Sequence, residues 1–130
     1  MVDGEKLVYE ILNTALGSTY DIYTDAVQAI AKYPCITVEE TDNYTPQEYM
    51  DGSNNDNYTA SVIEINIYTE AKENLGKKEQ AKPIFAAVDA VMLSNGFRRM
   101  STVPFSRDTY YRIAVRYIAL IGNDETIYRR

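Results

Sequence analysis

The residues of this sequence best placed to do chemistry are three acidic side chains, Glu39, Glu40 and Asp42, which lie close together in the chain. Neighbouring carboxylates can hold Mg²⁺ or act as an acid–base pair. The sequence contains 19 Asp and Glu residues, however, and charges on a strand edge also serve to discourage aggregation. We interpret the cluster as a solvated strand edge, and a small metal-dependent enzyme is the alternative.

Histidine is absent from the sequence. Its absence removes the commonest general base, the commonest metal ligand and every Ser-His or Cys-His nucleophile arrangement. The single cysteine, Cys35, stands between Pro34 and Ile36, a setting typical of a buried small hydrophobic residue rather than an activated thiolate. We therefore predict no catalytic residue, no cofactor and no metal site, and a protein that is not an enzyme.

Tyrosine is abundant, with twelve copies, and tryptophan is absent. Tyr44, Tyr49 and Tyr58 lie in or beside a polar segment, and tyrosine in such a setting suits protein interfaces because it offers a large contact area with a polar tip. The same side chains can instead fold back on their own domain. The interface interpretation is the one we carry forward.

Charge is unevenly distributed along the chain. The net charge is −6, which opposes binding to a phosphate backbone. Residues 1–97 hold six Lys and no Arg against 16 acidic residues, whereas residues 98–130 hold seven Arg against three acidic residues. Complementary charges of this kind can steer one subunit onto another. Charge balance within a single monomer is the alternative.

Two long helices are indicated by the spacing of apolar residues. One covers residues 3–16, with Asp3 as its cap and Gly17 ending it in a left-handed conformation. The other covers residues 77–94 and stops at Asn95-Gly96, and it tolerates Pro83 only if that residue falls in its first turn. A short helix is also predicted over residues 24–33, before Pro34.

Four strands are indicated by alternating apolar and polar residues, at 35–41, 58–69, 97–103 and 109–121. A long loop at 42–57, a hairpin loop at 104–108 and a C-terminal tail at 123–130 complete the chain. The predicted fold class is α+β: a largely antiparallel four-stranded sheet with two main helices packed on one face, in a single domain spanning residues 1–130.

The cellular setting is also suggested by the sequence. One cysteine allows no intramolecular disulfide, and the N-terminal residues lack the basic and apolar regions of a signal peptide. No apolar stretch approaches the roughly 20 residues that a membrane-spanning helix needs. We expect a soluble protein of the cytoplasm with no membrane partner.

Four segments of the sequence, taken in their order along the chain, resemble the tail-terminator or tail-completion proteins of long-tailed phages. They are Tyr33–Glu40, Ala60–Glu70, the helix Lys77–Asn95 closing with Gly96-Phe97-Arg98, and Tyr111–Tyr117. None of these segments is a catalytic signature. The resemblance rests on their order and spacing over most of residues 33–121, and Pro83 departs from the unbroken helix that it implies.

The resemblance implies a virion structural protein that forms a homo-oligomeric ring, a hexamer. The ring would cap the tail tube, end tail polymerisation and join the tail to the head connector, with the tail tube protein and a head-connector or stopper protein as partners. It implies assembly in the host cytoplasm and a final place at the head–tail junction, with DNA passing through the lumen without specific binding. Alternatives are a head–tail adaptor or head-closure protein of the phage neck, and a regulatory binding module of the host.

A ring needs two complementary surfaces on each subunit. We expect these surfaces to be the acidic loop 42–57 and the arginine-bearing hairpin 98–116. The candidate interface residues are Tyr44, Tyr49, Asp51, Asp56, Arg98, Arg99, Arg112 and Arg116.

Overall fold

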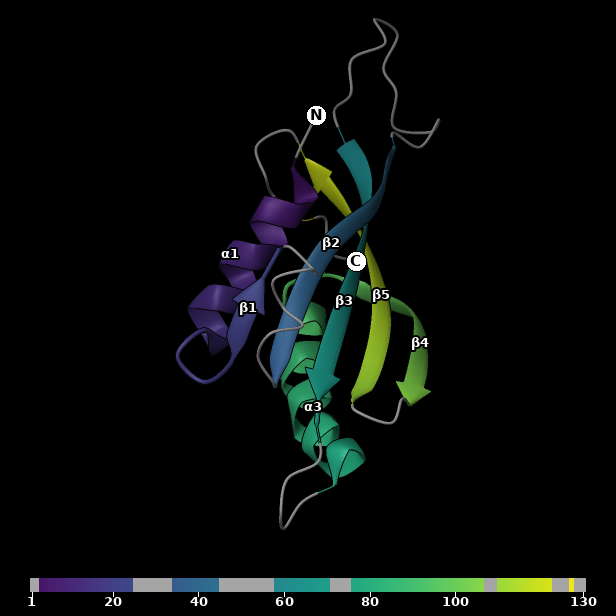
Figure 1. Cartoon of the computed structure of the whole chain (residues 1–130). Coiled ribbons are helices and arrows are strands. Elements are labelled where there is room, and N and C mark those ends of the chain that lie inside the picture. The colour runs from purple at the N-terminus through teal and green to yellow at the C-terminus, as the bar shows by residue number, and fades with distance from the viewer. Residues whose placement is uncertain are drawn as a thin grey trace, which may run out of the picture.

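The computed structural model describes residues 3–24, 34–44, 58–70, 76–106, 110–122 and 127. The elements in chain order are α1 (Gly4–Leu16), β1 (Asp21–Tyr23), β2 (Cys35–Tyr44), β3 (Tyr58–Thr69), α3 (Lys77–Ser94), β4 (Arg98–Ser106) and β5 (Tyr111–Gly122). The fold is α+β: a five-stranded mixed sheet with α1 and α3 packed against one face (Figure 1).

Helix α1 begins where the sequence predicts. The Asp3 side chain accepts a hydrogen bond from the Lys6 backbone N–H at 3.0 Å, and Val8 and Leu12, one turn apart, are buried. The predicted left-handed cap at Gly17 is wrong, because this residue has φ −64°. Its N–H instead closes the last turn on the Asn13 carbonyl at 2.9 Å.

Helix α3 ends as predicted at Asn95-Gly96, where Gly96 has φ 93° and the Phe97 N–H bonds back to the Met92 carbonyl. Pro83, however, lies inside the helix rather than in its first turn. It lacks the N–H that would bond the Glu79 carbonyl. Pro83 and Glu79 are both exposed, so water can satisfy that carbonyl.

The strand order across the sheet is β1-β2-β3-β5-β4. The prediction of four strands is wrong by one, because the three-residue β1 was not expected. β1 pairs parallel to β2 through Ile22 and Ile36, and the other three pairings are antiparallel, as predicted. The predicted short helix at 24–33 lies outside the described residues except for Thr24.

Two predicted strands are longer in the structure. β2 continues to Tyr44, so the first three residues of the predicted loop 42–57 belong to a strand, and the rest of that loop lies outside the described residues. β4 runs through Pro104 to Ser106, where a hairpin loop was expected. Of the predicted tail 123–130, only Ile127 is described, and it bridges to Ile121.

The core lies between the sheet and the two helices. Ile63, Ile65 and Ile67 point into it from β3, as their alternation predicts, and meet Val8 and Leu12 of α1 and Val88 and Met92 of α3. Burying each such side chain contributes about 1.5–3 kcal/mol. On the other side of β3, Asn66 and Tyr68 are also buried, so this central strand is covered on both faces.

Candidate functional site

Strand β4 forms one edge of the sheet and is exposed along its whole length. It also carries apolar side chains that an ordinary edge strand would avoid. Met100 is 53% exposed, Val103 45% and Phe105 36%. Apolar side chains gathered on an otherwise solvated edge indicate a surface that another molecule covers.

Two features prevent this edge from simply adding another strand. The pairing of β4 with β5 shifts register between Arg99 and Ser101, which places Met100 in a bulge. Pro104 has no N–H to donate to a neighbouring strand. A partner must therefore contact β4 mainly through side chains.

The four candidate arginines do not form one patch. Arg98 stands opposite Ile118 and Arg99 opposite Tyr117, so the two side chains point to opposite faces of the sheet. Arg99 lies on the helix side, where it forms a 3.0 Å ion pair with Asp89. Within the described residues the Arg98 side chain is exposed and forms no ion pair.

Arg112 and Arg116 lie on the face opposite the helices, which we term the helix-free face. Arg116 Nε is 3.3 Å from one Glu64 oxygen, and an Arg112 nitrogen is 3.8 Å from the other. Arg112 also donates to Asn66 Oδ1 at 2.7 Å. Charge balance within one monomer therefore accounts for Arg99, Arg112 and Arg116, and leaves Arg98 available to a partner.

Tyr44 closes β2 and is 43% exposed, as an interface residue requires. The other candidates from the predicted acidic loop, Tyr49, Asp51 and Asp56, lie outside the described residues. The structure thus describes only the first three residues of that loop.

Within the acidic cluster of Glu39, Glu40 and Asp42, Glu40 has a structural role that the sequence did not indicate. Glu40 Oε2 accepts hydrogen bonds from the Gly4 N–H at 3.2 Å, the Ser61 hydroxyl at 2.5 Å and the Asn43 amide at 3.1 Å. This carboxylate ties the start of α1 to the sheet. Among the described residues, no group of three acidic or cysteine side chains is arranged to hold a metal ion.

Cys35 is buried, as predicted. Burial raises the pKa of its thiol to about 12, and the nearby carboxylate of Asp21 contributes in the same direction. A thiol with so high a pKa stays protonated at neutral pH and is a poor nucleophile.

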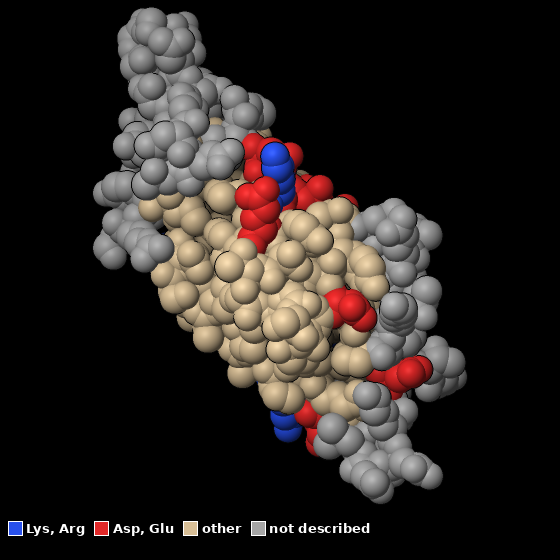
Figure 2. Space-filling model, turned by 90° about the vertical axis from the view of Figure 1, so that its left-hand side faces the viewer, with Lys and Arg blue, Asp and Glu red and all other residues tan. Residues whose placement is uncertain are grey.

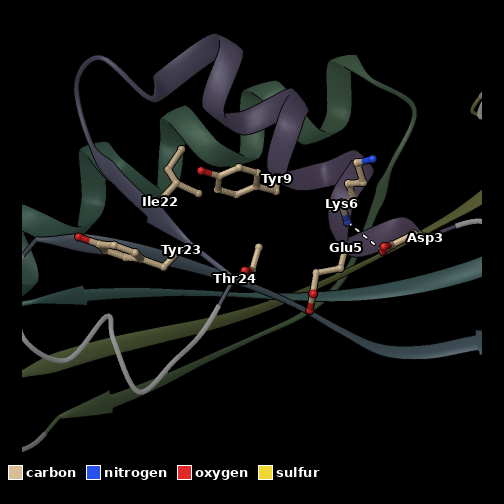
Figure 3. Close-up of a pocket in the computed structure, with 7 residues that line it drawn as sticks. All are labelled: Asp3, Glu5, Lys6, Tyr9, Ile22, Tyr23 and Thr24. Atoms are coloured by element: carbon tan, nitrogen blue, oxygen red, sulfur yellow. Dashed lines mark hydrogen bonds between the residues drawn. The ribbon is translucent and has the colours of Figure 1, made fainter.

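A shallow groove lies between α1 and β1, at the edge of the sheet opposite β4 (Figure 3). Tyr9 and Ile22 form its apolar part, and Asp3 and Glu5 stand at one end of it. Both carboxylates are held in place by backbone donors, since Asp3 accepts from the Lys6 N–H and Glu5 from the Glu40 N–H at 3.3 Å. Sequence reasoning did not find this groove because β1 was not predicted.

The two edges of the sheet carry opposite charge. The described residues of segments 3–24 and 34–44, which build the α1–β1–β2 edge, contain seven acidic residues and one lysine. The edge strand β4 contains Arg98 and Arg99 and no acidic residue, and Arg99 is paired with Asp89. On the α1–β1 side, acidic side chains outnumber basic ones, and the largest acidic group, at the upper end, surrounds one basic side chain (Figure 2).

No family model matches the sequence, and a comparison with curated proteins gives no significant match. Within the part of the chain that the structure describes, neither helix has the length and apolar character needed to cross a membrane.

Proposed function

We propose that this chain is a tail-terminator protein of a long-tailed phage, which assembles into a homo-oligomeric ring, a hexamer, on the end of the tail tube. The observation that carries the proposal is the β4 edge, where Arg98, Met100, Val103 and Phe105 are all exposed on one strand. These side chains combine apolar area with a guanidinium that forms no ion pair among the described residues, the composition that favours association with another protein.

The position of this edge supports a closed ring over a symmetric dimer. A head-to-tail ring needs two different surfaces on each subunit, related by a rotation that closes. The β4 edge and the acidic α1–β1–β2 edge lie on opposite sides of one sheet and differ in charge. Each subunit can therefore contact one neighbour through each edge.

The net charge suits a ring through which DNA passes. Each subunit carries −6, and acidic surfaces facing the lumen would repel phosphates and let DNA slide without being held. In this role the ring ends tail polymerisation and presents its other side to a head-connector or stopper protein. Its place in the virion is the head–tail junction, after assembly in the host cytoplasm. The protein has no catalytic role in this proposal.

The test is the mass of the purified protein by light scattering, alone and with tail tubes, followed by negative-stain imaging. We expect a ring of about six subunits in solution or at tube ends. Binding to portal or head proteins without affinity for tube ends would identify a head–tail adaptor instead. A monomer that binds neither tubes nor portal would contradict the proposal.

A further inference from the structure

We propose that the β4 edge of one copy docks into the α1–β1 groove of the next copy, with Met100 on the apolar part and Arg98 on the acidic end. This inference rests on the proposed ring, for which it names the contact between neighbouring subunits.

Met100 and Arg98 are suited to enter a groove. The bulge in β4 turns Met100 outward, and it is the most exposed of the large apolar side chains described. Methionine is unbranched and fits irregular apolar surfaces. Arg98 lies two residues away with its charge unpaired in the described part of the subunit. The two side chains offer an apolar anchor and a cation together.

The groove offers the complementary chemistry. Tyr9 and Ile22 provide apolar contact, and each of the Asp3 and Glu5 carboxylates has one oxygen bound to a backbone N–H. The second oxygen of each has no hydrogen bond among the described residues, so it can accept from a guanidinium. Lys6, which also lines the groove, directs its ammonium group away from Tyr9 and Ile22 (Figure 3).

Strand addition between copies is disfavoured at both edges. On β4, Pro104 lacks a donor, and on the part of β2 beyond its pairing with β1 the Glu40 N–H already bonds to Glu5. The acidic and basic edges therefore meet through side chains. Because the two surfaces differ, the contact is head-to-tail and can continue around a ring.

Two single substitutions test the two sides of the contact. Met100→Glu replaces the apolar anchor with a carboxylate on the apolar part of the groove, and Thr24→Arg puts a bulky cation in the groove where Arg98 should approach. Both positions are exposed, so the fold should persist, which circular dichroism and thermal melting will check. We expect each variant to weaken self-association at least about tenfold.

Matched controls separate the site from the general effect of adding charge. Leu93→Glu adds the same charge at another exposed apolar residue, on α3, and Thr14→Arg adds the same side chain on α1 outside the groove. We expect both controls to assemble like the wild type.

An equimolar mixture of the two variants is the decisive measurement. Met100→Glu keeps an intact groove and Thr24→Arg keeps an intact β4 edge, so the mixture should give a 1:1 dimer by light scattering and no ring. Two results would overturn the inference: assembly of Thr24→Arg at wild-type strength, or a mixture that stays monomeric. In either case a ring formed by the wild type leaves the proposed function standing. A wild type that is monomeric with and without tail tubes would overturn both.

Discussion

Replacing Asp89 with Ala should destabilise the fold by about 1–4 kcal/mol. Asp89 Oδ1 accepts a 2.8 Å hydrogen bond from the hydroxyl of Tyr117, which is fully buried on β5, and its other oxygen pairs with Arg99 at 3.0 Å. Leaving a buried hydroxyl without its partner costs about 1–3 kcal/mol. The Arg99 side chain is 43% exposed, so that ion pair adds only about 0–1 kcal/mol.

The assay is urea unfolding followed by circular dichroism, with Arg99→Ala and Tyr117→Phe as companions. Arg99→Ala should cost less than about 1 kcal/mol, because it leaves the buried hydrogen bond in place. The Tyr117→Phe background lacks the buried hydroxyl that donates to Asp89, so Asp89→Ala should cost roughly 1 kcal/mol or less there. Equal costs of Asp89→Ala in both backgrounds would refute this account of the contact.

The same contact predicts a dependence of stability on alkaline pH. Burial, and then the hydrogen bond to Asp89, raise the pKa of Tyr117 above its usual value of 10.0. The folded protein therefore keeps this proton where the unfolded chain loses it. Its contribution to stability is fully present below pH 10.0 and is lost as the pH rises above that value. Tyr117→Phe should reduce the slope of stability against pH above 10.0.

Three further predictions concern other contacts. Gly4→Ala should lower stability by about 1–3 kcal/mol in urea unfolding, because an added Cβ would lie 2.1 Å from the Ser61 hydroxyl. Gly76→Ala, at the exposed start of the other helix, is the control and should lower stability less. Alkylation of Cys35 at pH 9 should be nearly three orders of magnitude slower in the folded protein than in urea (roughly several hundredfold), because raising the pKa from 9.0 to about 12 lowers the thiolate fraction by that factor. Equal rates would contradict this prediction. Arg112→Lys should cost about 1 kcal/mol in a thermal melt, because lysine cannot keep both the Asn66 hydrogen bond and the stacking over the Phe105 ring at 5.0 Å; an unchanged melting temperature would contradict this.

The elements with strong local signals were predictable from the sequence. The helix at 77–94 has apolar residues at helical spacing and is followed by Asn95-Gly96. Gly96 has a positive φ, a conformation that glycine adopts more readily than other residues. The core face of β3 follows in the same way from the alternation of Ile63, Ile65 and Ile67. In each case the physical cause lies within a few residues of its effect.

Other features depend on residues far apart in the chain, and the sequence gives no local sign of them. β1 has one buried residue, Ile22, in three, which is too short to show a period, and it exists because β2 pairs with it. Pro104 suggests a loop from the sequence, yet it lies in β4. An edge strand tolerates proline because no neighbouring strand needs its N–H as a donor. The role of Glu40 depends on Gly4, 36 positions earlier.

The candidate site was predictable only in part. The exposed Arg98 and Tyr44 were identified from residue type, but the partners of Arg99, Arg112 and Arg116 were not, because Asp89 and Glu64 come close only in the folded sheet. Met100 and the groove beside Tyr9 gave no signal, since each is created by a neighbouring strand rather than by a motif.

The central pairing of β3 with β5 has a consequence for how fast the protein folds. These strands pair at twelve successive positions, yet all of α3 and β4 lie between them in the chain. Contacts between distant segments form only after the entropy of closing a long loop has been overcome, so we expect folding on the order of milliseconds or slower. Until β5 is in place, the newly made chain leaves one side of β3 without its partner strand. The β4 edge is completed last, because β4 is held in the sheet only by its pairing with β5. In the proposed ring, the rate at which subunits become able to assemble would be set by this late step.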